Sequence, residues 1–126
     1  MAEMPKYENL LEFLARQCLE DSERWFGDAP KKVHYSLSFL TLCLSGEVGE
    51  AANVIKKVER GSVTFVEEVK EAYTMEIVDA FVYLLNIAGV LGIDLEEKYY
   101  EKRAFNEERF MQQREWREKA RVARQH

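Results

Sequence analysis

The segment EIVDAFVYLLNIAGVLGIDL, residues 76–95, decides the fold class. Its most apolar run, Ile77 to Leu91, contains an aspartate and is shorter than the roughly 20 residues that a membrane-spanning helix needs. Apolar side chains fall on almost every side of a helix with this sequence, which is typical of a helix buried in a protein core. We therefore expect a core helix here and no membrane partner.

The composition predicts one compact all-α domain over residues 1–126. Hydrophobic residues make up 47% of the chain, which is enough for a core and too much for a disordered segment. The chain has only 2 prolines and 6 glycines, whereas a sheet protein needs frequent turns. The net charge of −5 disfavours non-specific binding to nucleic-acid polymers and to anionic membranes.

The cysteines and the first residues predict a cytoplasmic protein. Cys18 and Cys43 lie in apolar helical patterns without the close Cys or His neighbours of a zinc site, so we expect reduced core thiols. Met1 to Asn9 carries acidic residues and lacks the apolar run of a secretory signal. Glycine-rich phosphate loops and the HExxH motif are also missing from the sequence, so any chemistry has to come from carboxylates.

Apolar residues recur at helical spacing in four stretches, which predict four helices. The first covers residues 7–25, Tyr7 to about Trp25, and the second runs from residues 33–36 as far as Arg60. A loop at residues 27–30 separates them, and Gly61 is expected to end the second helix.

Two capping boxes are predicted to open the remaining helices. Thr64 with Glu67 begins a third helix that ends at Gly92, and Asp94 with Glu97 begins a fourth. The basic residues near the end of the fourth stretch suit a helix C-terminus. Four helices with short connections predict a four-helix bundle.

Paired carboxylates interrupt the apolar faces of two of these helices. In the second, Glu47 stands in an apolar seam and Glu50 follows one turn later; the seam comprises Leu37, Leu40, Leu44, Ala51, Ile55 and Val58. Gly46 and Gly49 flank Glu47 at a cost in helix propensity of about 1 kcal/mol each, which predicts close approach of another group. In the third helix one polar stripe crosses an otherwise apolar sequence and consists of Glu76, Asp79, Tyr83 and Asn86.

Acids that cluster inside a core stay protonated, pair with bases or bind a cation, and two such pairs favour the cation. Oxygen ligands suit Mg²⁺, Mn²⁺ or Ca²⁺. A di-iron bundle uses Glu-x-x-His, and neither His34 nor His126 follows a glutamate at that spacing. The alternative, in which the acids lie on solvated helix faces or pair with lysines, stays open.

The paired acids and their surroundings resemble the MazG-like, all-α nucleoside triphosphate pyrophosphohydrolases. The resemblance covers residues 40–110 and rests on three segments: LSGEVGEAANVIKK at residues 44–57, the segment quoted above, and KRAFNEERF at residues 102–110. The family signature is ExxE on one helix and ExxD on the next. Many members carry a further glutamate where this chain has Gly46, and this difference bears on the number of metal ions.

The resemblance implies a four-helix MazG-like bundle, assembled as a homodimer or homotetramer, that hydrolyses a (deoxy)nucleoside triphosphate to the monophosphate and pyrophosphate in nucleotide-pool cleaning. It implies Mg²⁺ as cofactor, with Mn²⁺ as a substitute. The implied ligands are Glu47, Glu50, Glu76 and Asp79, and either Glu47 or Glu50 is expected to act as general base. The expected substrate contacts are Lys57, Lys102 and Arg109 at the phosphates, Trp25 and His34 at the base, and Asn106, whose part of the substrate is not specified.

Two alternative functions remain. A phosphoribosyl-ATP pyrophosphohydrolase has the same arrangement of acids and would be separated by its substrate. A non-catalytic helical module, in which the acids are structural and the basic end of the last helix binds a partner protein, predicts no stabilisation by divalent ions.

Overall fold

The computed structural model describes residues 8–126, and within them it contains helices and no strand. The elements are α1 (Leu10–Phe26), the 3₁₀ helix η1 (Pro30–Tyr35), α2 (Leu37–Glu59), α3 (Glu67–Leu91) and α4 (Leu95–Arg124). The all-α prediction is confirmed. Tyr7, where the first helix was predicted to begin, lies outside the described residues.

Side-chain caps fix three of the helix starts. The side-chain oxygens of Asn9, Ser36 and Asp94 accept hydrogen bonds from backbone N–H groups three residues later, and these bonds open α1, α2 and α4. The capping box predicted at Thr64 is wrong, because α3 begins at Glu67 after Val66, which makes no side-chain cap. The Thr64 carbonyl instead accepts from the Val66 N–H, so the chain turns before the helix begins.

Two glycines end helices as predicted. Gly61 (φ +79°) follows the last turn of α2, and Gly92 (φ +68°) ends α3; both lie in the left-handed region that glycine adopts without strain. The loop predicted at residues 27–30 is confirmed for residues 27–29, but the 3₁₀ helix η1 over residues 30–35, which was not predicted, lies between it and α2. Its Lys31 and Lys32 have positive φ values of 67° and 50°, which are strained for residues with a Cβ atom.

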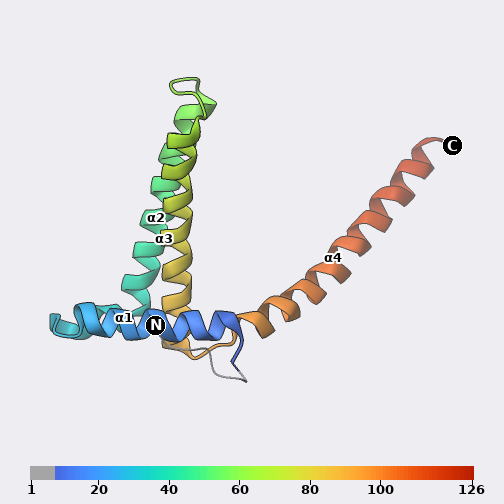
Figure 1. The fold of residues 1–126 in the computed structure, drawn as a ribbon. Coiled ribbons are helices and arrows are strands. Elements are labelled where there is room, and N and C mark those ends of the chain that lie inside the picture. Colours follow the sequence, from blue (N-terminus) through green and yellow to red (C-terminus); the bar gives the residue numbers. More distant parts are fainter. Residues whose placement is uncertain (1–7) are drawn as a thin grey trace. The chain divides into compact units, whose positions relative to one another are not determined.

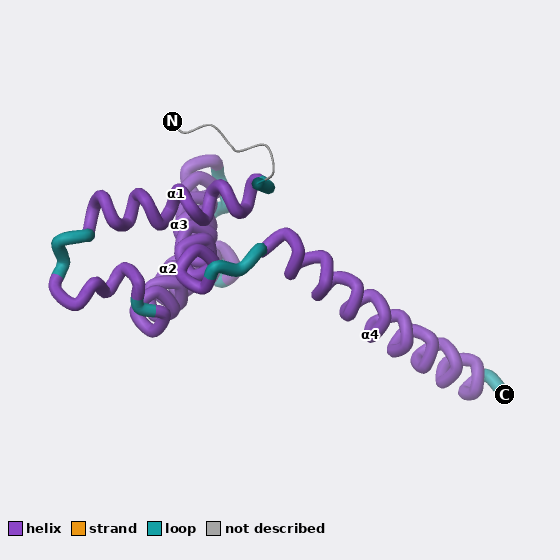
Figure 2. Tube along the Cα trace, turned by 90° about the horizontal axis from the view of Figure 1, so that it is seen from below, coloured by secondary structure: helices purple, strands orange, loops and turns teal. Residues whose placement is uncertain are grey.

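The chain forms two compact units, Met1–Ile93 and Asp94–His126. In the first unit α2 and α3 form a long antiparallel hairpin, and α1 lies across the hairpin near the start of α2 and the end of α3 (Figure 1). The same crossing is seen when the hairpin is viewed end-on (Figure 2). A Cβ atom on Gly89 would lie only 2.7 Å from Leu19 Cγ and 3.0 Å from the Ala15 carbonyl, so this glycine sets how closely α1 approaches α3.

The core of the first unit is thin. Its buried apolar residues are mostly small and are Phe13, Ala15, Leu40, Ala51, Ala80, Leu85 and Ala88. Large apolar side chains of α3 are exposed instead, among them Met75, Ile77, Val78, Phe81, Val82 and Leu84. A single chain therefore leaves an apolar surface on α3 larger than isolated surface residues explain.

By length and composition alone, α3 could cross a membrane. One such helix is weak evidence for a membrane span, and 22% of its apolar window is buried, so a single chain does not bury it as the core helix expected from the sequence. The helix also carries Glu76 and Asp79 in its middle, where charged groups are costly in lipid.

The second unit consists of α4, a helix of 30 residues that presents no buried side chain. It is rich in charged residues, and local pairs such as Lys98–Glu101 (3.0 Å) and Arg121–Glu118 lie along it. Aromatic side chains are spread between these charges and exposed, with Trp116 at 77%.

Candidate functional site

Three of the four predicted acids meet between α2 and α3. Glu47 and Glu50 lie one turn apart on α2 and face Glu76 on α3, and one carboxylate oxygen from each lies within 4.8 Å of the others. Glu76 Oε2 is buried and has no hydrogen-bond partner in the described part of the chain. A carboxylate oxygen in that position lacks the compensation that a buried charge needs.

The close approach of these carboxyl groups shifts their protonation. A hydrogen bond with Glu76, the Glu76 charge and burial raise the pKa of Glu50, and a hydrogen bond with Glu47 together with burial raises the pKa of Glu76. Such hydrogen bonds between carboxyl groups require a proton. The site therefore favours uptake of positive charge, as protons or as a cation, over three free carboxylates.

Asp79 lies one turn beyond Glu76 on α3, outside this set of three acids. Its negative charge contributes to the raised pKa of Glu50 and of Glu76, so it adds to the same field. Together with Glu47 it borders a cavity. The predicted metal set thus divides into three converging glutamates and one neighbouring aspartate.

The cavity beside the acids has a volume of about 520 Å³. Its walls come from α1, η1, α2 and α3, and include Cys18, Asp21, Trp25, Phe26, Val33, His34, Phe39, Glu47, Asp79, Val82, Tyr83 and Asn86. Both residues predicted to contact a base, Trp25 and His34, therefore lie in one cavity with two of the predicted acids. Mostly apolar walls with a few polar groups are typical of sites for small organic ligands.

His34 is anchored from behind by Glu23. The His34 Nε2 atom lies 2.8 Å from Glu23 Oε2, and the Tyr35 hydroxyl donates to the same oxygen at 2.6 Å. These two hydrogen bonds lower the pKa of Glu23 to about 2, and the bond from Tyr35 makes the larger contribution. Although His34 itself is 3% exposed, it is held by a carboxylate at the surface, and the strained turn at Lys31 and Lys32 brings it there.

Trp25 forms the open edge of the cavity. It is 61% exposed at the end of α1, and its ring packs edge-on against Phe26 with Arg24 above it at 5.6 Å. An exposed indole beside a cavity has a free face for stacking.

A buried pair that sequence reasoning missed lies deeper in the cavity. The Ser22 hydroxyl on α1 donates to Asn86 Oδ1 on α3 at 3.1 Å. Asn86 belongs to the polar stripe of α3, which was a signal, although only the acids of that stripe were assigned a role. No local pattern singles out Ser22, which is 64 residues away from Asn86 in the chain.

The predicted phosphate contacts, together with Asn106, lie on two helices. Lys57 is exposed on α2, two turns beyond Glu50 and about 10 Å from it along the helix axis. Lys102, Asn106 and Arg109 lie on α4, in the second unit. Their contact with a phosphate stays a prediction.

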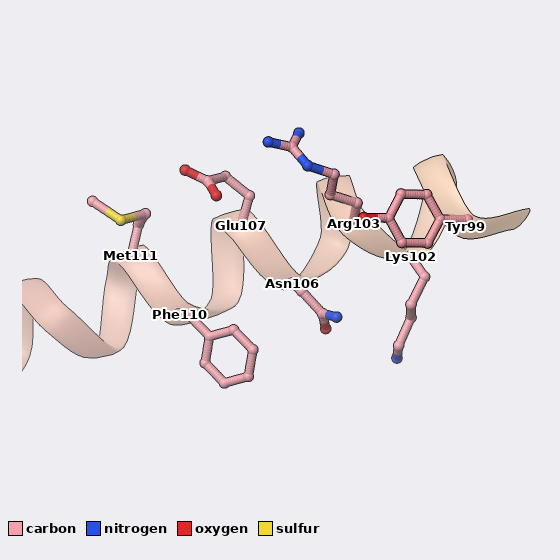
Figure 3. A pocket seen from close by; sticks show the side chains of 7 residues that line it. All are labelled: Tyr99, Lys102, Arg103, Asn106, Glu107, Phe110 and Met111. Carbon is pink, nitrogen blue, oxygen red and sulfur yellow. The ribbon is translucent and has the colours of Figure 1, made fainter. Parts of the chain in front are cut away.

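On α4, Lys102 and Asn106 border a shallow groove of about 260 Å³, which Arg109 does not line (Figure 3). Lys102, Asn106 and Phe110 point to one side of the helix, at four-residue spacing. Arg109 lies 4.5 Å from the centre of the Phe110 ring. The family-like motif thus forms a face with one cation, one amide and one aromatic ring.

Two local expectations need revision. A Cβ atom on Gly46 or on Gly49 would meet no described atom within 4 Å, so the close approach predicted there does not occur within the described chain. Cys18 and Cys43 are free thiols as expected, but both are only partly buried. Burial raises the pKa of Cys18, which keeps this thiol protonated.

Neither a protein-family model nor a curated protein matches this chain. The resemblance to the MazG-like family therefore rests on the paired acids and on the motif from Lys102 to Phe110. The chemistry of the site follows from its own residues: a cluster of carboxylate oxygens that could hold a cation, next to a cavity in the size range of small organic ligands.

Proposed function

We propose that this protein is a Mg²⁺-dependent, MazG-like pyrophosphohydrolase that converts a (deoxy)nucleoside triphosphate to the monophosphate and pyrophosphate. One observation carries the proposal: Glu47 belongs both to the cluster of three glutamates and to the wall of the cavity that holds Trp25 and His34. A cation-binding group and a base-binding cavity that share a residue suit a nucleotide bound by both ends.

The donor set fits the cation. Three carboxylates without a nitrogen or sulfur ligand suit Mg²⁺, with Mn²⁺ as a substitute, and the unpartnered Glu76 Oε2 would gain a partner. Glu47, Glu50 and Glu76 would hold the ion, with Asp79 beside them. When bound, Mg²⁺ supplies positive charge to the phosphates and makes water more acidic.

The carboxylates of the chain move the proton. Glu47 or Glu50 accepts a proton from the attacking water, whose oxygen forms a new bond to the α-phosphorus. The bond from that phosphorus to the bridging oxygen breaks, and pyrophosphate leaves with the bonding electrons. Lys57, Lys102 and Arg109 are proposed to orient the phosphates, and Asn106 to hydrogen-bond to them.

The proposal includes a four-helix arrangement assembled as a homodimer or homotetramer in the cytoplasm. Its support is the apolar surface of α3, where Met75, Phe81 and Leu84 are exposed in a single chain. Light scattering after size-exclusion chromatography tests this part. A monomer at micromolar concentration would contradict it.

The test of the reaction is release of pyrophosphate together with monophosphate from a panel of NTPs and dNTPs in Mg²⁺, Mn²⁺ or EDTA. We expect metal-dependent formation of both products in equal amounts, and loss of turnover of about 100-fold or more in Glu47→Gln. Glu71→Gln, an exposed acid on the same hairpin, is the matched control and should remain active. Absence of products from every triphosphate would contradict the proposal.

The alternatives are tested in the same experiment. Turnover of phosphoribosyl-ATP alone would identify the related pyrophosphohydrolase. The exposed aromatic residues of α4, such as Tyr99 and Trp116, favour the second alternative, a helical interaction module. That alternative predicts neither turnover nor stabilisation by Mg²⁺.

A further inference from the structure

Asn86 is a polar side chain in an otherwise apolar part of α3, and it lines the cavity although only 5% of its surface is exposed. Its Oδ1 atom accepts from the hydroxyl of Ser22, which is also buried. This bond holds the carbonyl end of the amide at Ser22 on α1, so Ser22 occupies the acceptor end and leaves the two donors of the NH₂ group unused.

The amide nitrogen of Asn86 makes no hydrogen bond within the described residues. The fully buried side-chain polar atoms without a hydrogen-bond partner in the described residues are His34 Nδ1, Glu76 Oε2 and Asn106 Oδ1. The Asn86 nitrogen is not among them, so it is accessible to water. The NH₂ group is therefore open to the cavity. An amide donor in such a place has no protein partner and is free to donate to an acceptor of a ligand that enters the cavity.

The position of Asn86 matches the far end of a nucleotide. It lies on α3 two turns beyond Asp79, or about 10 Å along the helix axis, and both residues border the same cavity. A phosphate held near the acids would place the rest of the nucleotide along this path. Trp25, Phe39 and Val82 line the same cavity and provide apolar surface against which an aromatic ring can pack.

We propose that Asn86 is the specificity-determining residue of the cavity and that its NH₂ group donates to a carbonyl oxygen or ring nitrogen of a nucleobase. This inference rests on the proposed function, since it names the part of the substrate that the cavity takes. Ser22 is a positioning residue that holds the amide through Oδ1. Trp25 covers the ring from the open side.

The test uses uncharged ligands and no metal, so that it does not depend on the acids. In a Trp116→Phe background, Trp25 is the remaining tryptophan, and its fluorescence reports on the cavity. Deoxycytidine, deoxyuridine, deoxyadenosine and deoxyguanosine are titrated in EDTA, with deoxyribose as the ligand that lacks a ring. We expect saturable quenching by at least one nucleoside and none by deoxyribose.

Three variants probe the amide. Asn86→Leu removes the donor, and we expect about tenfold weaker nucleoside binding and a raised KM with nearly unchanged kcat. Asn86→Asp keeps an oxygen for Ser22 and replaces the donor by an acceptor, so it should weaken binding to the same ring at least as much. Ser22→Ala should weaken binding less, because it only loosens the amide.

A purely structural pair predicts a different pattern. Asn86→Leu and Ser22→Ala would then lower the melting temperature alike, and the affinity of the folded protein for nucleosides would not change. That result, or the absence of quenching by all four nucleosides, would overturn the inference. Pyrophosphate release with an unchanged KM in Asn86→Leu would refute the role of Asn86 alone, whereas Asn86-dependent nucleoside binding without turnover would refute the proposed reaction alone.

Discussion

The two longest helices, α3 and α4, distribute their polar and apolar side chains in opposite ways. In α3 the polar residues Glu76, Tyr83 and Asn86 face the interior of the first unit, while Phe81 and other apolar residues are exposed. In α4 charged residues predominate and aromatic rings such as Trp116 stand singly among them.

This difference separates two kinds of exposed apolar residue. On α3 large apolar residues are exposed, whereas Glu76 and Asn86 stand among the smaller apolar residues of the inward face. The proposed cation and the proposed partner chain would compensate these two features. On α4 caps and ion pairs of i, i+3 spacing support the helix locally. Matched substitutions on α3 and α4 test this difference between the two helices.

The largest effect is expected for an inward acid of α3. Glu76→Gln replaces one of the three clustered carboxylates by a neutral amide, and we expect it to lower turnover by about 100-fold or more. Its control on α4 is Glu108→Gln, an exposed acid that should leave turnover nearly unchanged. The assay is pyrophosphate release; equal activity of both variants would remove the distinction between the helices.

A charge on the outer face of α3 comes next. Phe81→Glu should break the proposed oligomer and cost about 2–4 kcal/mol of stability, because a charge would replace a ring that the proposed partner chain covers. Trp116→Glu on α4, where the ring is more exposed, should change stability by less than about 0.5 kcal/mol. Sedimentation and thermal unfolding measure both, and similar small effects would argue that α3 has no partner chain.

The acids also predict how stability depends on pH. The pKa of Glu50 and that of Glu76 are raised above 4.5, so the native state binds these protons more tightly than the unfolded state. Their contribution to stability is present below pH 4.5 and is lost as pH rises through the raised pKa values. The proposed Mg²⁺ would compete with these protons, so the increase of the melting temperature that it causes should grow from pH 5 to pH 8, to about 5 °C.

The pKa of Glu23 is shifted in the opposite direction, so its contribution to stability depends on pH in the opposite way. Its pKa is lowered to about 2, so its contribution is present above pH 4.5 and is lost as pH falls toward 2. Scanning calorimetry from pH 2 to pH 8 with EDTA or Mg²⁺ separates the two groups. A Mg²⁺ effect that is larger at pH 5 than at pH 8 would be incompatible with a shared cation site.

A smaller effect is expected at the crossing of α1 and α3. Gly89→Ala places a Cβ atom 2.7 Å from Leu19, and the overpacking outweighs the gain in helix propensity, for a net loss of about 1–2 kcal/mol. Gly46→Ala, with open space around it, should instead gain about 1 kcal/mol. Urea denaturation compares them, and a loss at Gly46 would point to a neighbour from another chain.

The smallest effect concerns the start of α4. Asp94→Ala removes the side-chain acceptor for the Glu97 N–H and should cost about 1 kcal/mol, seen as increased hydrogen exchange in the first turn of α4. Exchange in α3 should not change. Increased exchange in both helices would show that their stabilities are coupled.

The helices could be predicted from the sequence because their signals are local. Apolar spacing, the cap at Asp94 and the glycine at position 92 act within a few residues, and they locate α4 and the end of α3. The cap at Thr64 was wrong because the chain turns there, and the helix begins where Glu67 and Glu68 both occupy the first turn, which suits the positive helix N-terminus.

The site was only partly predictable for the same reason. Glu47, Glu50 and Glu76 follow from spacing within two helices that pack together, whereas the Ser22–Asn86 bond joins residues that no pattern connects. The 3₁₀ helix was missed because lysines at positions 31 and 32 adopt positive φ, where sequence rules expect glycine or asparagine.

Because Glu47 belongs to the acidic cluster and also lines the cavity, binding at one of these places affects binding at the other. Neutralising its charge in the acidic cluster changes the electrostatic potential inside the cavity, and an occupant of the cavity changes the affinity of the cluster for a cation. Linkage requires the two effects to be equal: a cation that tightens cavity binding by some factor is itself bound more tightly by that factor once the cavity is filled. If the proposed cation and nucleotide bind as inferred, this one carboxylate couples the two binding events with no conformational change required.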